Sequence, residues 1–295
     1  MGSLLQLKDA FVEKFRQLTA WDAYIATIQQ HRRRAIRVNT LKISVPDLKK
    51  RLEEQGWLLT SIPWCPEGFY ITGERRDIGL LEEHQRGYFF AQRSTSMIPS
   101  ILLQPKPTDA VLDLCAAPGG KTTHLATLMK NKGIIVANEP FPHRAQELMI
   151  NLQRCGVLNN VVTQQFGEAI TNKTFDKILL DAPCSNSGSL RGNTKKSQTI
   201  MRLWNQKRVK RFAEIQKRLI THAYALLRPK GTLVYSTCSL DPEEDEAVVD
   251  YLLEKTDARL DTIDLPLAVK DKKYYKIWPQ ENDTDGFFVA KLRKP

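Results

Sequence analysis

The segment VLDLCAAPGGKTT, residues 111–123, decides the fold of this chain. A short apolar run, Val111–Cys115, leads into two alanines, a proline and two glycines, and a helical pattern follows at about 120–130. Small residues and glycines let the backbone turn sharply and approach a ligand closely, and the first N–H groups of a helix are free to bind an anion. The turn matches neither GxGxxG nor GxxxxGKS/T, so NAD and ATP lose support as ligands.

Strands and helices alternate around this turn. Five apolar runs are typical of buried strands: 111–115, 133–139, 161–165, 175–184 and 231–239. Helical patterns lie at about 120–130, 142–155, 204–227 and 242–255, and residues 286–293 alternate like a final strand. This order is typical of a parallel sheet covered by helices on both faces. Ligands of open parallel sheets bind outside the carboxyl ends of the strands, so the residues after each strand are candidates for a site.

The first ninety residues have a different pattern. Apolar residues recur every three or four positions through the first thirty residues, which predicts a helix. The sequence then predicts short elements in the order strand, helix, strand, strand, at 35–42, 46–55, 57–63 and 68–72. We therefore expect two domains, a small α+β module at 1–90 and a larger α/β domain at 91–295.

The charge of the chain favours a polyanionic partner. Its 295 residues include 44 Lys and Arg against 33 Asp and Glu, a net charge of +11, within a globular composition. One basic cluster is 31–34 with Arg37, and such phosphate contacts give affinity without reading sequence. A second cluster opposes ten basic residues to Glu214 alone: Arg191, Lys195, Lys196, Arg202, Lys207, Arg208, Lys210, Arg211, Lys217 and Arg218. Trp204 and Phe212 lie within it at helical spacing, which favours the core over base stacking.

Several classes of protein are disfavoured. No apolar run approaches the roughly 20 residues of a membrane helix, and the N-terminus lacks the pattern of a signal peptide. An odd number of cysteines, five, indicates a reducing compartment, so we expect a cytoplasmic protein. There is no CxxC pair and no histidine cluster, so we expect no metal site. Cys65 and Cys155 have no motif around them and are interpreted as structural.

The second predicted strand ends at Asn138-Glu139. A carboxylate at this position can accept hydrogen bonds from two ribose hydroxyls, as in the dinucleotide-binding folds. Glu139 and the turn after Cys115 together indicate a nucleoside ligand with an anionic group, such as S-adenosylmethionine. Arg144, five residues after Glu139, is either part of this site or a helix-surface charge.

Two later strands end in cysteines, within Asp181-Ala-Pro-Cys184 and Ser236-Thr-Cys238. Neighbouring strand ends can bring two thiols and one carboxylate into one cleft. This set suits methylation of cytosine, because addition of a thiolate to carbon 6 makes carbon 5 nucleophilic, and a second group must then assist release. A carboxylate beside ring N3 would stabilise the charged intermediate. Asp181 can donate to N3 only in its protonated form, which a desolvated cleft would favour.

These segments resemble the NOL1/NOP2/Sun (RsmB/RsmF-like) family of RNA cytosine-5 methyltransferases. The matching segments span nearly the whole chain in family order: Arg37–Thr40, Phe90–Gln92, Ser96–Pro99, Asp113–Lys121, Leu180–Ser185, Tyr235–Ser239 with Glu243-Glu244, and Asp285–Arg293. The resemblance implies a Rossmann-like methyltransferase domain that uses S-adenosylmethionine. Its sheet would be seven-stranded and mostly parallel with an antiparallel last strand, behind a small RNA-binding module. It implies Cys238 as nucleophile and Cys184 as the residue that aids product release.

The resemblance also implies a cofactor site. The positions expected around the cofactor or the base are Cys115, Ala116, Ala117, Pro118, Gly119, Gly120, Lys121, Glu139, Arg144 and Asp181. Two positions depart from the family: Asn186 stands where glycine usually follows Pro-Cys-Ser, and Gln165-Phe-Gly-Glu168 lacks the aspartate that usually contacts adenine. Asparagine tolerates left-handed backbone, so we expect the loop to persist. Either Glu168 replaces the aspartate or that contact is missing.

Two function classes remain open. The first is an enzyme that makes 5-methylcytidine in structured RNA, with ribosomal RNA favoured over transfer RNA. The second is a non-catalytic RNA-binding or assembly factor on the same fold, which is disfavoured because every residue that the chemistry requires is present. The N-terminal module and the basic segment 191–218 are expected to select the RNA by shape. The target base must be unstacked to reach a thiol. We expect a monomer.

Overall fold

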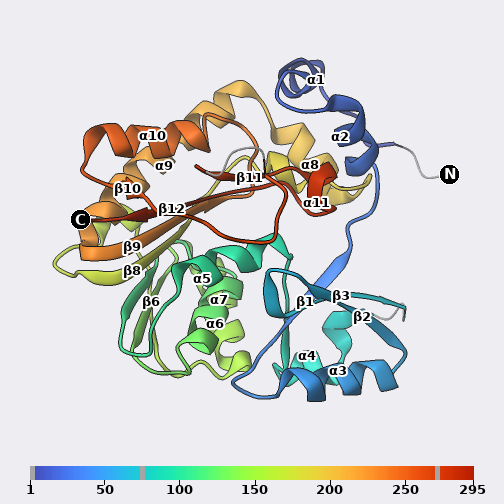
Figure 1. Cartoon of the computed structure of the whole chain (residues 1–295), viewed down its shortest axis with the longest axis vertical. Helices are drawn as coiled ribbons and strands as arrows, with labels where there is room; N and C mark the ends of the chain where they lie inside the picture. The colour runs from blue at the N-terminus through green and yellow to red at the C-terminus, as the bar shows by residue number, and fades with distance from the viewer. Residues whose placement is uncertain (1–3, 74–76, 270–272) are drawn as a thin grey trace.

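The computed structural model describes residues 4–73, 77–269 and 273–295. They form two sheets (Figure 1), a small antiparallel one in the order β2-β3-β1-β4 and a large mixed one in the order β10-β12-β9-β8-β5-β6-β7. The seven strands of the large sheet confirm the predicted architecture, and an eighth, β11, pairs with β12.

The large sheet has a parallel centre. The strands β5 to β9 pair in parallel, and β12 runs antiparallel to β9, as the predicted last strand should. The bounds are β5 (Ala110–Asp113), β6 (Ile134–Asn138), β7 (Asn160–Thr163), β8 (Phe175–Asp181), β9 (Leu227–Thr237), β10 (Arg259–Leu260), β11 (Tyr275–Ile277) and β12 (Phe287–Arg293). The central strands agree with the apolar runs in the sequence, and their carboxyl ends all reach the same edge.

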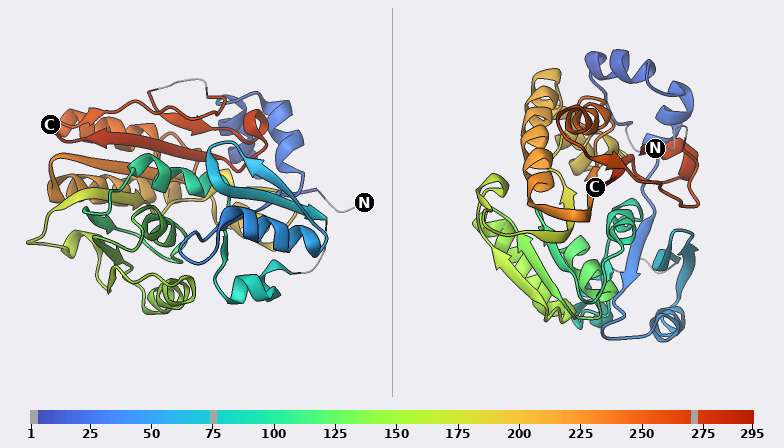
Figure 2. Two further views of the ribbon diagram at one scale, coloured as in Figure 1. Left: turned by 60° about the horizontal axis from the view of Figure 1, so that its bottom comes forward. Right: turned by 60° about the vertical axis from the view of Figure 1, so that its left-hand side comes forward.

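Helices cover both faces of this sheet (Figure 2), because its strands alternate apolar residues to either side. Val111 faces one hydrophobic cluster and Leu112 the other. The first cluster is closed by α5 (Ile98–Leu103), α6 (Gly120–Leu128) and α7 (Pro142–Cys155). The second is closed by α9 (Gln206–Leu226) and α10 (Glu246–Lys255).

The small sheet has its own core. Its elements are β1 (Arg34–Val38), α3 (Val45–Glu54), β2 (Trp57–Ile62), β3 (Cys65–Gly73), α4 (Glu82–Gln85) and β4 (Phe89–Ala91). The strand predicted at 35–42 ends at Val38, because the buried Asn39 side chain donates to the carbonyls of Gly87 and Cys155 and turns the chain. Helix α3 begins where expected, since the Ser44 hydroxyl accepts from the N–H of Asp47.

The predicted N-terminal helix is two helices, α1 (Asp9–Arg16) and α2 (Trp21–Ile28), and residues 1–3 lie outside the described residues. The break lets Phe11 and Phe15 of one helix and Tyr24 of the other pack around Trp204 and Trp278. Trp204 is therefore a core residue, as its spacing indicated. Trp204 follows α8 (Lys195–Leu203). The sequence predicted neither α8 nor α11 (Pro279–Asn282). Among the described residues, no helix is long and apolar enough to cross a membrane.

Candidate active site

The turn after β5 forms as the sequence predicts. Gly119 has φ of +102° and caps α6, a left-handed conformation that glycine adopts without strain. The Ala117–Pro118 peptide bond is cis. The Ala117 carbonyl accepts from Arg144 (3.0 Å) and the Pro118 carbonyl from Asn151 (2.9 Å). These bonds to α7 fix the turn at the amino end of α6.

A buried carboxylate lies at the end of β6. Glu139 is 1% exposed, its Oε1 accepts from the N–H of Phe141 (3.2 Å), and its Oε2 lies 3.3 Å from the Arg144 guanidinium. Asn138 beside it donates to the carbonyls of Leu114 and Gln165, and so ties the ends of three strands together. Arg144 is thus joined to both the turn and Glu139, and is more than a helix-surface charge.

A cavity of about 640 Å³ opens over the ends of β5, β6 and β7. Cys115 and Glu168 line it, with two aromatic rings, Phe141 and Phe166. The rings meet edge to face with their centroids 6.5 Å apart, although they are 48% and 67% exposed. Two apolar rings exposed beside a buried carboxylate form a wall suited to a nucleoside. Neither ring was predicted as a site residue, although each follows a strand end.

Glu168 lies where it could partly replace the aspartate that usually contacts adenine. Its carboxylate lines the cavity but lies 3.4 Å from the Arg218 guanidinium of α9. An adenine amine placed in the cavity would share this carboxylate with Arg218.

The two predicted cysteines meet. Cys184, after β8, and Cys238, after β9, have their sulfur atoms 3.2 Å apart, and both are free thiols. Hydrogen bonding from Cys184, aided by the charge of Arg93, outweighs burial and lowers the pKa of Cys238 to about 7. The same hydrogen bond, together with burial, holds the pKa of the Cys184 thiol well above its usual range. The pair therefore favours one thiolate, on Cys238, that accepts from a neutral Cys184.

A buried polar network holds the two cysteine loops together. The Glu244 carboxylate accepts from the N–H of Ser185 (2.8 Å), from Gln216 (3.0 Å) and from the Ser239 hydroxyl (3.3 Å). Burial raises the pKa of Glu244 to about 7. The Asp241 carboxylate accepts from both Ser185 and Ser239 and pairs with Lys14 of α1. In the sequence, Glu244 stood out only as part of a motif. Its role in joining the two loops is visible only in the folded structure.

The Asp181 carboxylate lies at the same edge, at the end of β8. Its Oδ2 is 2.7 Å from the Lys121 Nζ, and its Oδ1 accepts from the Ser236 hydroxyl at 2.7 Å. Lys121 follows the turn after β5, and Ser236 precedes Cys238, so Asp181 joins the two halves of the site. Lys121 and Ser236 both donate to this carboxylate.

Asn186 occupies the position where glycine was expected. Its φ of +65° is left-handed, so the loop keeps the expected conformation. Its side chain accepts from the Cys238 thiol (2.9 Å) and donates to the Cys184 carbonyl (3.0 Å). The substitution therefore adds a contact to each cysteine.

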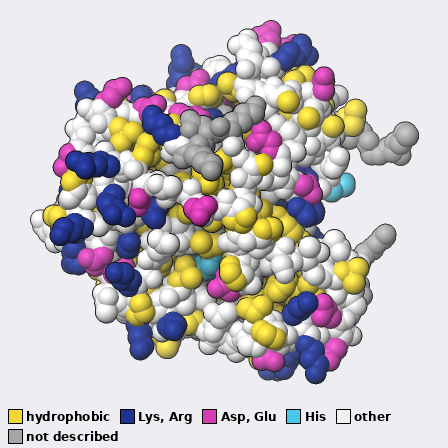
Figure 3. All heavy atoms as spheres, in the orientation of Figure 1, with side chains coloured by type: hydrophobic (Ala, Val, Ile, Leu, Met, Phe, Trp, Pro, Cys, Tyr) yellow, Lys and Arg dark blue, Asp and Glu magenta, His cyan; other side chains and the backbone are white. Residues whose placement is uncertain are grey.

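The two basic clusters have different environments. In the first, Arg37 is buried and donates to Gln92, Gly120 and Thr123, while Arg32 pairs with Asp285. These arginines join the small sheet to the larger domain. In the second, Arg191 is buried, but several others are exposed on α8 and α9: Lys195, Lys196, Arg202, Lys207, Lys210, Arg211 and Arg218. On the face shown in Figure 3, basic side chains are interspersed with acidic ones, so net charge alone does not locate a binding surface.

Two family models match this chain. Residues 100–293 match the family described as 16S rRNA methyltransferase RsmB/F. Residues 7–94 match the N-terminal domain of 16S rRNA methyltransferase RsmF.

Relatives of known name match over nearly all of this chain. It is 42% identical to the tRNA (cytosine(49)-C(5))-methyltransferase of Pyrococcus abyssi, over 98% of this chain and 97% of that protein. It is 39% identical to Ribosomal RNA small subunit methyltransferase F of Vibrio parahaemolyticus, over 98% of this chain. The chain spans only 63% of the length of that second relative.

Solved structures share the fold. A methyltransferase homologue from Pyrococcus horikoshii is 36% identical with a TM-score of 0.84, over 98% of this chain and 100% of that one. NSun6 from the same organism, solved with the S-adenosylmethionine analogue SFG, is 26% identical with a TM-score of 0.87, over 97% of this chain and 98% of that one. These matches confirm the family that the motifs predicted: the chain belongs to the RsmB/F methyltransferase family.

Proposed function

We propose that this protein transfers a methyl group from S-adenosylmethionine to carbon 5 of a cytidine in structured RNA, through a covalent bond between Cys238 and the base. The observation that carries the proposal is the approach of two free thiols to 3.2 Å at neighbouring strand ends, beside Asp181. The lowered pKa of Cys238 agrees with a reactive role for this thiol.

The residues around the cavity fit the cofactor. The 640 Å³ space with the Phe141 and Phe166 rings in its lining suits an adenosine. The buried Glu139, which precedes the lining residue Pro140, suits the ribose hydroxyls, and the amino end of α6, which follows the lining residue Cys115, suits a carboxylate. When bound, S-adenosylmethionine supplies the electrophilic methyl group. Glu139 would hold the ribose hydroxyls and Arg144 would hold Glu139 and the turn in place. Residues 115–121 would follow the cofactor closely, with Cys115 beneath it.

Cys238 is assigned as the nucleophile because it is the member of the pair that favours the thiolate at neutral pH. Its sulfur forms a bond to carbon 6, and the electron pair of the 5,6 double bond then makes carbon 5 the nucleophile. Asp181, held by Lys121 and Ser236, stands where it can face the polar edge of the base. After methylation, carbon 5 must lose its proton so that the bond from sulfur to carbon 6 can break.

Cys184 is assigned to this release step. Its neutral thiol is stabilised by donation to the Cys238 thiolate. Once Cys238 is bonded to carbon, that acceptor is lost, so the largest cause of the raised pKa of Cys184 is removed, while burial remains. Cys184 can then give its proton to solvent, and the resulting thiolate accepts the carbon 5 proton as the bond from Cys238 to carbon 6 breaks.

Structured RNA fits the surface beside the thiols. A second cavity, of about 380 Å³, lies between the Asn186 loop and α8, with Lys195, Lys196 and Arg208 in its lining. These cations can hold phosphates while one base is flipped toward the sulfurs. We propose that residues 1–90 form the RNA-binding module and residues 91–295 the catalytic domain. Ribosomal RNA is the first substrate to test, because both matching family models describe 16S rRNA enzymes.

The test uses two variants, with labelled cofactor and both ribosomal and transfer RNA as substrates. Cys238→Ala should reduce methyl transfer by about 10⁴-fold or more. Cys184→Ala should form the adduct but fail to release it, so a covalent protein–RNA species should accumulate on denaturing gels. Cys155→Ser is the control that changes a buried thiol elsewhere. Normal turnover by Cys184→Ala would contradict the division of roles, and transfer to tRNA alone would replace rRNA as the substrate.

A further inference from the structure

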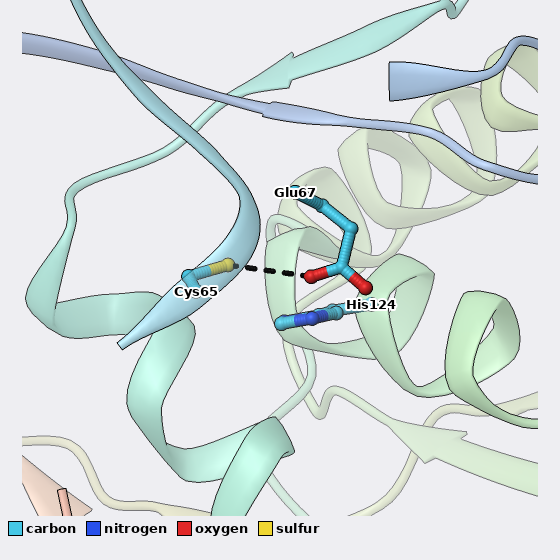
Figure 4. Close-up of side chains that lie close together, drawn as sticks. All are labelled: Cys65, Glu67 and His124. Atoms are coloured by element: carbon cyan, nitrogen blue, oxygen red, sulfur yellow. Dashed lines mark hydrogen bonds between the residues drawn. The ribbon is translucent and has the colours of Figure 1, made fainter. Parts of the chain in front are cut away.

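A second group of ligand-type side chains lies between the two sheets, away from the thiol pair. Figure 4 shows Cys65 and Glu67 of β3 converging with His124 of α6. One potential ligand atom from each residue lies within 4.8 Å of the other two. Cys65 and His124 are fully buried and Glu67 is partly buried, so the group has one side open to solvent.

His124 is the unexplained member of this group. Neither of its ring nitrogens has a hydrogen-bond partner in the part of the chain that the structure describes, although the residue is 0% exposed. Buried polar atoms are nearly always paired, so an imidazole with two unpaired nitrogens needs an explanation. The ring extends toward Cys65 and Glu67 (Figure 4), where a bound ion would use one nitrogen.

The spacing suits a tetrahedral ion. The Cys65 Sγ and the Glu67 Oε2 are 3.7 Å apart. Zinc bonds of about 2.3 Å to sulfur and 2.1 Å to oxygen at a tetrahedral angle place the two ligand atoms about 3.6 Å apart.

The chemical types of these three ligands favour some metal ions over others. A thiolate and an imidazole favour zinc over magnesium and calcium, which prefer sets of oxygen ligands. The negative charges of a Cys65 thiolate and of Glu67 would balance a divalent ion. A zinc ion with three protein ligands takes water at its fourth position.

We propose that Cys65, Glu67 and His124 bind one zinc ion, which joins the N-terminal module to helix α6. The site differs from the absence of metal that the sequence predicted. Its ligands come from two modules and lack the short spacing of known zinc motifs. Arg37 fixes the same helix from β1, by donating to the Gly120 carbonyl and to Thr123. Because α6 begins at the cofactor turn, the ion would couple the position of the N-terminal module to that turn.

The first experiment measures metal in the full chain, purified without a polyhistidine tag. Wild type should hold about one zinc per chain by mass spectrometry. Cobalt(II) should bind in its place and give a thiolate-to-cobalt charge-transfer band. Cys65→Ser should lose the band and at least tenfold in zinc content. Cys155→Ser, which alters another buried thiol, should keep both. A folded wild-type chain that gives no thiolate band with cobalt would overturn the proposal.

A second variant covers the case in which Cys65→Ser does not fold. Glu67→Gln changes a partly exposed side chain and should leave the circular dichroism spectrum unchanged. Its zinc affinity, measured by competition with a chromogenic chelator, should fall at least tenfold, and added zinc should raise its Tm less than that of wild type. An affinity equal to that of wild type would remove Glu67 from the site and contradict the three-ligand proposal.

Discussion

The two halves of the candidate active site are built in opposite ways. At the ends of β8 and β9, buried serines and carboxylates hold Cys184 and Cys238 in a closed hydrogen-bond network. At the ends of β5 to β7, the cavity is open, and its rings Phe141 and Phe166 are about half or more exposed. Groups that react must be held within fractions of an ångström, whereas a cofactor must enter and leave in every turnover. Substitutions in the two halves should therefore change different kinetic constants.

The largest loss of activity is expected from disrupting the hydrogen-bond network around Cys184 and Cys238, the thiol half of the site. Glu244→Ala removes the acceptor of three buried donors, from Ser185, Gln216 and Ser239. Leaving buried donors unpaired costs about 3 kcal/mol of unfolding free energy. Release of the two loops should lower kcat about 100-fold, because small misplacements of reacting groups have effects of that size. Denaturant unfolding and steady-state kinetics measure the two effects.

Glu243→Ala is the matched control for this prediction. Glu243 is the neighbouring acid, 36% exposed and paired with Lys14, so its loss should cost less than about 1 kcal/mol. The closed-network interpretation would be wrong if the two variants lost equal activity, or if Glu244→Ala raised only the KM for the cofactor.

Part of the candidate site could be predicted from the sequence. Strand ends and their motif residues were predictable, because a short apolar run followed by Asp181-Ala-Pro-Cys184 or Ser236-Thr-Cys238 is a local pattern. Since parallel strands end at one edge of the sheet, the meeting of the two thiols followed from topology.

Long-range pairing was not predictable. Arg37 looked like an RNA contact in the sequence, yet it is buried and bonded to residues of the larger domain. The break between α1 and α2 follows from packing around Trp204, which lies far along the chain. His124 and Cys65 gave no local signal, because each is a single residue on a separate module. A pattern reports which residues are present, whereas their partners are set by tertiary structure.

A smaller effect is expected from the cofactor half. The double variant Phe141→Ala, Phe166→Ala removes the two exposed rings that line the cavity. Loss of stacking should raise the KM and Kd for S-adenosylmethionine about tenfold and leave kcat within twofold, because ground state and transition state lose the same binding. Calorimetric titration and kinetics test this. Leu158→Ala, an 81% exposed apolar residue elsewhere, is the control. An unchanged Kd would place the adenine outside this cavity.

The smallest effect is expected from Asn186. It distinguishes an influence of this side chain on the pKa of Cys238 from an influence on the loop conformation alone. The Asn186 side chain accepts a hydrogen bond that only the protonated Cys238 can donate, so it stabilises the thiol. Cys184 acts in the opposite direction and lowers the pKa of Cys238 to about 7. Asn186→Gly removes the acceptor and keeps the left-handed backbone, which glycine adopts freely. The pKa of Cys238 should then fall further.

The sign of this effect is measurable. Activity depends on the thiolate, so kcat/KM should rise as pH increases through about 7 in the wild type. In Asn186→Gly the midpoint of this rise should lie at a lower pH, by about one pH unit or less. The pH dependence of the alkylation of Cys238 by iodoacetamide should shift by the same amount. Asn186→Ala should show the same shift together with a lower Tm, because alanine in left-handed backbone costs about 1 kcal/mol. If the midpoint of Asn186→Gly stayed at the wild-type pH, the side chain would matter only for loop conformation. The pKa of Cys238 would then be set by its other neighbours, Cys184 first among them, with no contribution from the Asn186 side chain.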